Sequence, residues 1–183
     1  MLTTAELGRY IDGHLTREAF RLEQLDRYDV ASDGADFERF TRGEPGPDAA
    51  RKQPWLDRLR RAAQDGVSWR RVHVLRTPLT DYLRYECEWG YAFNARAGED
   101  IGIIDLAEQQ PEGLPDHDFW LLDNRHPVRL HYGTGGQFLG AEVVAAAGLP
   151  FYQRARSKTL TAAEPFAAWW QRHTEEWREH RAA

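Results

Sequence analysis

Residues 114–144, LPDHDFWLLDNRHPVRLHYGTGGQFLGAEVV, decide how the chain is expected to fold. They contain three short runs rich in β-forming residues, at 118–123, 127–132 and 137–144, and residues typical of hairpin turns separate the runs. Strands that follow one another through short turns pair in an antiparallel manner. The stretch therefore predicts a three-stranded meander, and we expect the rest of the chain to be built around it.

Hydrophobic spacing and turn residues predict the elements around this meander. Further strands are expected at 19–23, 69–76 and 101–106. Short or terminal helices are expected within 1–18, where Thr3 or Thr4 is the N-cap, and at 36–42, 151–159 and 161–181. Residues 43–48 are rich in Gly and Pro and are expected to form a linker.

Two helices are expected in the middle of the chain. Pro54 suits the first position of a helix that ends at Gly66. Thr77-Pro78 is expected to begin a second helix, which frays near Gly90 and gives way to a loop over 91–99.

The order of these elements predicts an α+β fold. We expect a mixed sheet that ends in the three-stranded antiparallel meander, with helices packed on it and a C-terminal helical pair. The 183 residues are the length of one domain. Its parts would be an N-terminal segment of strand, helices and linker (1–48), a helix with the mixed-sheet core (49–144) and the C-terminal helices (145–183).

Composition limits the classes of partner. A net charge of -5 and a pI near 5.8 disfavour broad electrostatic binding to nucleic acid. The chain has no apolar stretch of membrane-spanning length and no signal-like start, so a cytoplasmic protein without membrane contact is expected. The single cysteine, Cys87, fits a reducing compartment, and the absence of Cys and His clusters at ligand spacing argues against structural zinc. No metal site and no cofactor are expected.

The cluster Asp116-His117-Asp118 precedes the first strand of the meander. Two acids beside a histidine could perform acid–base chemistry or bind a cation. Capping of backbone N–H groups at the strand start is the stronger interpretation, because Asp commonly has that role.

Glu86 shares a predicted helix face with apolar residues, so its carboxylate should be half-buried and need a partner. A structural ion pair with Arg70 or Arg71 is the preferred interpretation. Arg84 has the spacing for surface ion pairs with Asp81 and Glu88.

No catalytic residue is predicted. Cys87 is expected to be a small buried apolar residue, and no nucleophile or phosphate-binding motif is present. An aromatic stripe near the C-terminus is expected to pack in the core. As alternatives, it could form a groove for a protein partner or a helix for homodimerisation. Its members are Phe166, Trp169, Trp170 and Trp177. Adjacent Trp169 and Trp170 cannot face the same way, so one of them should be partly exposed.

Several motifs occur together along nearly the whole chain: 19–23 with Tyr28, 78–86, Asn94 with 97–101, 114–115 with 118–123, Tyr132, Gly136, 138–142, and Pro165-Phe166 with Trp169-Trp170. In this order they resemble an actinobacterial domain family of unknown function. Such proteins are typically encoded beside helix-turn-helix regulators, and the resemblance therefore implies a regulatory accessory role.

A second resemblance concerns residues 117–123, HDFWLLD, and the order of strands around them. These are similar to half of a phospholipase D-like domain. Asp116 stands at the position of the catalytic His and Asp118 at that of the Lys, so the resemblance implies a related fold with degenerate chemistry.

The first functional hypothesis is a non-catalytic regulatory domain that binds a protein partner, a helix-turn-helix regulator. The alternative is a small-molecule sensor or enzyme with an acidic and aromatic pocket. Direct nucleic-acid binding would need the arginines of 58–61 and 70–76 on one surface. The candidate ligand- or partner-binding residues are Tyr82, Arg84, Glu86, Asn94, Glu99, Asp100, His117, Asp118 and Trp120.

Overall fold

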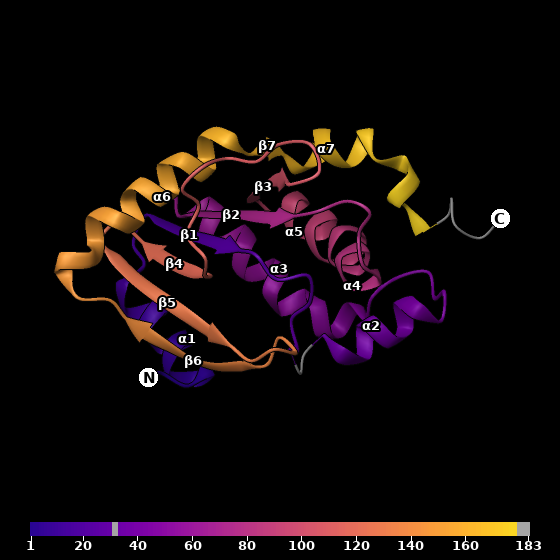
Figure 1. Cartoon of the computed structure of the whole chain (residues 1–183). Coiled ribbons are helices and arrows are strands. Elements are labelled where there is room, and N and C mark those ends of the chain that lie inside the picture. The colour runs from indigo at the N-terminus through magenta and orange to yellow at the C-terminus, as the bar shows by residue number, and fades with distance from the viewer. Residues whose placement is uncertain (31–32, 179–183) are drawn as a thin grey trace.

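A seven-stranded mixed sheet organises the protein (Figure 1). The computed structural model describes residues 1–30 and 33–178, and the strand order is β6-β5-β4-β1-β2-β3-β7. The strands are β1 (Glu18–Glu23), β2 (Ser68–Leu75), β3 (Glu99–Asp105), β4 (Phe119–Leu122), β5 (His126–Tyr132), β6 (Phe138–Val143) and β7 (Glu164–Pro165). Strands β1, β2 and β3 are parallel, and the remaining neighbours pair in an antiparallel manner. The predicted α+β class and mixed sheet are confirmed.

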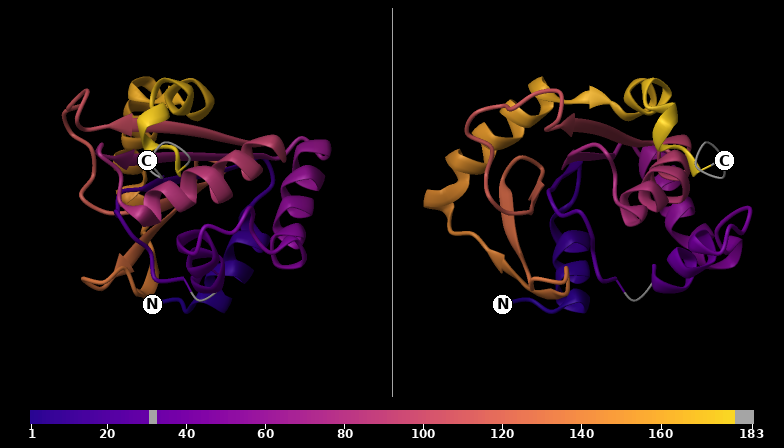
Figure 2. Two further views of the ribbon diagram at one scale, coloured as in Figure 1. Left: turned by 90° about the vertical axis from the view of Figure 1, so that its right-hand side faces the viewer. Right: turned by 45° about the vertical axis from the view of Figure 1, so that its right-hand side comes forward.

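Helices cover both faces of this sheet. They are α1 (Thr4–His14), α2 (Gly34–Thr41), α3 (Ala49–Gln64), α4 (Asp81–Tyr85), a π-helix (Glu86–Tyr91), α5 (Ala92–Arg96), α6 (Leu149–Ala162) and α7 (Phe166–Arg172). Short 3-10 turns lie at Ala146–Gly148 and Thr174–Glu176. In both views of Figure 2, α6 and α7 lie toward the top and α1 toward the bottom, with strands between them.

Alternate side chains of each strand point to opposite faces. On one face, Phe20, Val72 and Phe119 pack against Tyr152 and other residues of α6. The opposite face packs against α1, α3 and the helical segment 81–96. We refer to this second face as the inner face, because the candidate site lies on it.

The meander is formed by β4, β5 and β6, as predicted. Asp123 and Asn124 have φ values of 50° and 56° in the β4–β5 turn, a conformation that Asn and Asp tolerate better than most residues. The Asp123 carboxylate also accepts hydrogen bonds from backbone N–H groups of residues 16–18, and thus ties this turn to the start of β1.

Helix α3 begins five residues before the predicted start at Pro54. The side chain of Asp48 accepts hydrogen bonds from the backbone N–H groups of Ala50 and Arg51, which caps the helix there. Pro54 lies inside the helix, where its missing N–H removes one backbone bond near the N-terminal end.

The helix predicted from Thr77-Pro78 was also placed wrongly. Thr80 is the N-cap, since its hydroxyl accepts a hydrogen bond from the N–H of Leu83. The chain does not fray at Gly90 but continues as the π-helix and α5 to Arg96, so the predicted loop over 91–99 is wrong.

The C-terminal segment differs from the single helix predicted over 161–181. Residues Glu164–Pro165 form the edge strand β7, and α7 ends at Arg172. Residues 179–181 of the prediction lie outside the described residues. Trp169 is 1% exposed while Trp170 is partly exposed, as expected for adjacent tryptophans on a helix.

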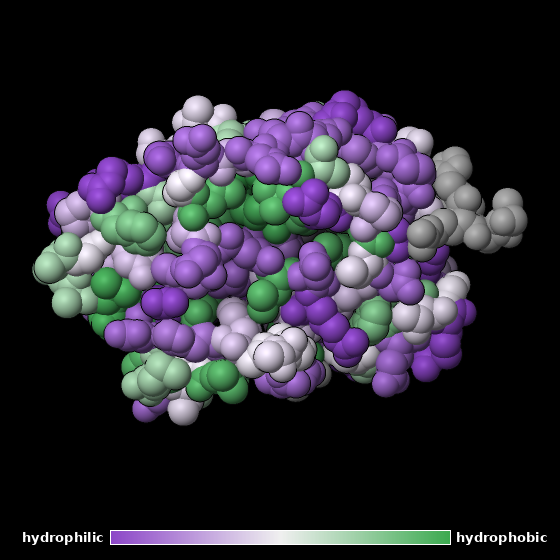
Figure 3. Space-filling view, viewed as in Figure 1, coloured by the Kyte–Doolittle hydropathy of each residue, from purple (hydrophilic) through white to green (hydrophobic). Residues whose placement is uncertain are grey.

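Polar residues cover most of the α6 side of the molecule, with an apolar area in its upper middle (Figure 3). Among the described residues, no helix combines the length and apolarity needed to cross a membrane.

Candidate functional site

The inner face of the sheet carries charged side chains at its centre, where apolar residues would be usual. Parallel pairing of β1 and β2 puts Arg21 opposite Arg71, and antiparallel pairing of β1 and β4 puts Arg21 opposite Trp120. Two guanidinium groups thus lie side by side on the middle strands. Such an arrangement requires nearby carboxylates.

Two buried carboxylates neutralise Arg71. Its Nη1 lies 2.7 Å from an oxygen of Glu23, and its Nε donates to Glu99 at 2.9 Å. The second oxygen of Glu99 accepts a hydrogen bond from the side-chain amide of Asn94 at 2.8 Å. Arg71, Glu23 and Glu99 are all buried, so this network fixes the relative positions of β1, β2, β3 and α5.

Arg21 completes the network. Its Nη2 lies 2.8 Å from Glu23 and donates to the hydroxyl of Tyr132 at 3.3 Å, and its guanidinium lies 5.2 Å from the centroid of the Trp120 ring. Burial opposes ionisation of Glu23, but the guanidiniums of Arg21 and Arg71 outweigh burial and lower its pKa to about 2. Glu23 is therefore charged at neutral pH.

A hydrogen-bonded extension of this network reaches β4. The buried carboxylate of Asp118 accepts a hydrogen bond from the Tyr28 hydroxyl at 2.6 Å and one from the backbone N–H of Gln24 at 3.0 Å. Burial raises the pKa of Asp118 to about 6. His73 contacts the hydroxyl of Tyr91 and the carbonyl of Leu25, and burial lowers its pKa, which favours the neutral ring.

A cavity of about 360 Å³ opens in front of the two arginines. Its floor comes from the sheet, one wall from α2 and α3, and the other from the helical segment 81–96. The lining residues are Arg21, Asp33, Asp36, Arg51, Lys52, Trp55, Arg71, Tyr85, Glu86, Gly90, Asn94 and Trp120. This volume is at the small end of the range for small-molecule sites.

Glu86 is the first residue of the π-helix and lies in the cavity wall. A Cβ atom on Gly90 would lie 3.2 Å from Oε2 of Glu86, so the glycine leaves room for this carboxylate. Burial, followed by the charges of Asp33 and Glu23, raises the pKa of Glu86 to about 7. At neutral pH the group can therefore donate or accept a proton.

The ion pair predicted between Glu86 and Arg70 or Arg71 is absent from the described residues. Arg71 is occupied by Glu23 and Glu99. Arg70 points to the other face of the sheet and pairs with Asp100 at 2.6 Å. Glu86 has neither a hydrogen bond nor an ion pair within 4.0 Å to any residue that the structure describes.

The predicted site residues divide between the cavity and other places. Glu86, Asn94 and Trp120 line the cavity. Glu99 lies behind Asn94, and Tyr82 belongs to an aromatic cluster beside Tyr85.

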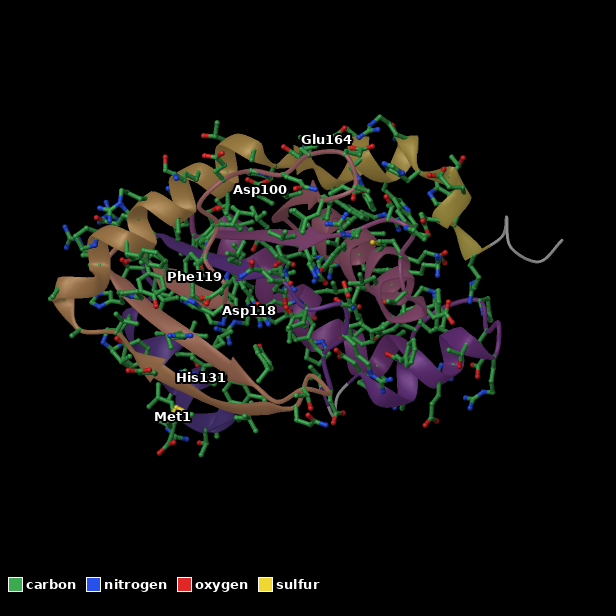
Figure 4. The ribbon with its side chains drawn as sticks, in the orientation of Figure 1. Met1, Asp100, Asp118, Phe119, His131 and Glu164 are labelled. Carbon is green, nitrogen blue, oxygen red and sulfur yellow. The ribbon has the colours of Figure 1, made fainter. Side chains whose placement is uncertain are left out.

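Other predicted site residues lie elsewhere. Arg84 was predicted to make ion pairs on the surface, and its ion pair with Asp81 is present. Arg84 is only 3% exposed, however, and it also pairs with buried Glu176, which was not predicted. Asp100 is exposed and lies well apart from Asp118 (Figure 4). His117 contacts Asp116 and Tyr152 on the α6 side.

Several cavity residues were not predicted as site residues: Arg21, Asp33, Asp36, Arg51, Lys52, Trp55, Arg71 and Tyr85. One available signal was the pair Arg21 and Glu23, two charges on the same face of a strand whose neighbours Phe20 and Leu22 are apolar. A strand that places charge on the inner face of a sheet marks a site of function or of buried pairing.

One cluster has metal-ligand side chains. Ligand atoms of Asp105, Glu108 and His173 lie within 4.8 Å of one another. Asp105 already accepts hydrogen bonds from the backbone and side chain of Thr77, and Glu108 pairs with Arg172 and His173. Protein groups thus use the carboxylates that a cation would need.

The cavity combines paired guanidiniums, a carboxylate without a partner among the described residues, and the rings of Trp55 and Trp120. These groups can bind a small polar molecule through charge-assisted hydrogen bonds and ring contacts.

A comparison with curated proteins found no match. A family model matches residues 5–171, which is most of the chain. The chain therefore belongs to the family described as Domain of unknown function (DUF6879).

Proposed function

We propose that this protein binds a small polar molecule in the central cavity, as a non-catalytic, ligand-sensing accessory of a DNA-binding regulator. One observation carries the ligand-binding proposal: a cavity of about 360 Å³ is built on a buried charged network, and Glu86 in its wall has no partner among the described residues. Placing a carboxylate in this way costs folding free energy, which suggests selection for binding.

Two further polar atoms at the cavity support this proposal. The Oδ1 atom of Asn94 and the Nε atom of Arg21 are buried and have no hydrogen-bond partner in the described part of the chain. Asn94 is only 5% exposed. A polar molecule bound in the cavity would supply hydrogen-bond partners for these two atoms.

The described part of the wall lacks the side chains typical of covalent catalysis, and we assign its titratable groups Glu86 and Lys52 to ligand binding. Ser, Cys and His, the commonest nucleophiles and bases, do not occur among the described lining residues. Cys87 is fully buried next to Glu86 in the chain, and burial raises the pKa of its thiol. A thiol in this state is a poor nucleophile.

The regulatory part of the proposal rests on the resemblance to proteins encoded beside helix-turn-helix regulators. Its test is affinity purification of this protein from its native host, with transcript profiling of a deletion strain. Recovery of such a regulator together with altered transcription supports the role. Absence of both results contradicts it.

Ligand binding is tested with two glycine variants. Gly90→Leu would fill the cavity, because Gly90 lines it, whereas Gly13 lies on the exposed side of α1 with nothing within 4 Å of an added Cβ. Circular dichroism first verifies that both variants are folded. A library of small polar metabolites, containing zwitterions, anions, cations and neutral molecules, is then screened by thermal shift and calorimetry.

We expect at least one metabolite to bind the wild-type protein and Gly13→Leu, and to lose its binding to folded Gly90→Leu. Binding that survives in Gly90→Leu would place the ligand outside the cavity. A wild-type protein that binds no member of the library would contradict the proposed function.

A further inference from the structure

Two opposite charges line the cavity without partners in the described residues. Glu86 projects from the π-helix and Lys52 from α3. Neither makes an ion pair within 4.0 Å or a side-chain hydrogen bond within 1–30 and 33–178. They face the same space from opposite walls, yet they are too far apart to neutralise each other by contact.

The other charged groups of the wall already have partners. Arg21 and Arg71 pair with Glu23 and Glu99 on the floor. Arg51 pairs with Asp36 at 3.4 Å, and Asp33 accepts a hydrogen bond from the hydroxyl of Tyr82. Glu86 and Lys52 are therefore the charges that remain for a bound molecule, one negative and one positive.

Glu86 lies in an unusual local structure, a π-helix with a glycine beside the carboxylate. A π-helix is rare and less favourable than an α-helix, and such insertions are frequent at functional sites. This one begins at Glu86, contains Gly90 and continues into α5, which carries Asn94, and all three residues line the cavity. A side chain at Gly90 would compete with the Glu86 carboxylate for space.

Burial shifts the pKa of both Glu86 and Lys52 toward the neutral form. Desolvation lowers the pKa of the Lys52 ammonium, and the nearby Glu86 carboxylate opposes that change. Desolvation raises the pKa of Glu86, and Lys52 acts in the opposite direction. A ligand that supplied a close counter-charge to each group would relieve both penalties.

We propose that the ligand is a small zwitterion whose protonated amine pairs with Glu86 and whose acidic group pairs with Lys52. This inference rests on the proposed function and names its ligand class. The rings of Trp55, Tyr85 and Trp120 line the same cavity. They can contact the apolar part of the ligand, and a ring face attracts an ammonium group. The volume of about 360 Å³ restricts the ligand to a small molecule.

The test is calorimetric titration of the full chain with the twenty common α-amino acids and with phosphoethanolamine, which separates carboxylate from phosphate as the acidic group. Each zwitterion that binds is compared with its N-acetyl form, which lacks the ammonium. Amino acids are also compared with their amide forms, which lack the carboxylate, and phosphoethanolamine with ethanolamine.

We expect at least one zwitterion to bind, and each blocked form to bind about tenfold more weakly or worse. Glu86→Gln and Lys52→Met should each weaken the zwitterion by a similar factor. Glu142→Gln makes the same chemical change at an exposed strand residue on the α6 side and should leave the affinity unchanged. Chemical denaturation verifies that every variant is folded.

The outcomes separate this inference from the proposed function. If no zwitterion binds while a simple anion, cation or neutral metabolite binds in a Gly90-dependent manner, the ligand class is wrong and the proposed function stands. A zwitterion whose affinity survives N-acetylation or Glu86→Gln also overturns the inference. If neither the zwitterions nor the metabolite library bind to the wild-type protein, both proposals are wrong.

Discussion

Replacing Glu86 with Gln should stabilise the unliganded protein at high pH. The pKa of this carboxyl rises from 4.5 to about 7 on folding, since burial and nearby Asp33 and Glu23 disfavour its charge. Ionisation of Glu86 above pH 7 therefore opposes folding, and the effect disappears as the pH falls toward 4.5. Gln cannot ionise, so the substitution removes this penalty.

The size of the effect follows from the pKa change. One pKa unit corresponds to about 1.4 kcal/mol, so a pKa near 7 in place of 4.5 opposes folding by about 3 kcal/mol at pH 8. For a domain of this size, about 3 kcal/mol raises the melting temperature by roughly 5–10 °C. At pH 5 the gain should fall to about 1 kcal/mol or less.

The assay is urea denaturation, followed by tryptophan fluorescence, of wild-type protein and Glu86→Gln from pH 5 to pH 9. Glu142→Gln is the matched control, because Glu142 is exposed and its contact with His131 at 3.4 Å is a surface pair, so its stability difference should stay within about 1 kcal/mol at every pH. A Glu86→Gln protein that is less stable than wild type at pH 8 would show that ionised Glu86 does not oppose folding. A gain that does not depend on pH would show the same.

Three further substitutions test the rest of the structure. Arg71→Met removes the ion pair of buried Glu99 and leaves buried Glu23 with Arg21 as its cation, so it should cost about 3–5 kcal/mol in urea denaturation. Arg70→Met, one residue away on the other face of the sheet, should cost less than about 1 kcal/mol, and equal losses would contradict the buried network. Trp169→Ala should lower the free energy of unfolding by about 3–5 kcal/mol, and Trp170→Ala should lower it by clearly less, because only the Trp169 ring is fully buried. A larger loss for Trp170→Ala would show that α7 is oriented differently. Tyr28→Phe removes the hydrogen bond from the Tyr28 hydroxyl to the buried carboxylate of Asp118 and should cost about 1–3 kcal/mol at pH 8. The cost should be smaller at pH 5, where the Asp118 carboxyl is largely protonated. A loss that is the same at both pH values would exclude that bond as its cause.

The meander could be predicted because its signals are local. The turn residues and the β-forming runs of 114–144 lie close together in the chain, and hairpin pairing needs no distant partner. The caps at Asp48 and Thr80 are local too, but proline at 54 and 78 drew the predicted helix starts away from them. The preference of proline for the first turn of a helix and the preference of Asp or Thr for the N-cap predict different starts here, and neither preference alone decides between them.

The central site could be predicted only in part, because it depends on non-local pairing. Glu86 was expected to be half-buried with an arginine as its partner. Parallel pairing of β2 with β3 brings Glu99 beside Arg71, and pairing of β1 with β2 brings Glu23 beside it, so Arg71 pairs with these two carboxylates instead of Glu86. The hydrophobic pattern of a strand restricts its register but does not identify the distant strand with which it pairs. The π-helix is hidden for another reason, since its apolar spacing from Trp89 onward departs from the regular 3.6-residue period.

The most direct test of ligand binding in the cavity uses the seven tryptophan indole N–H signals in a two-dimensional NMR spectrum. Single Trp→Phe variants assign the signals, and the protein is then titrated with the metabolite library and the amino-acid panel. Binding in the cavity predicts that the indole signals of Trp55 and Trp120 shift most, while that of Trp169, on the buried face of α7, stays in place. If the indole signals of Trp55 and Trp120 do not shift in any titration, ligand binding in the cavity is contradicted.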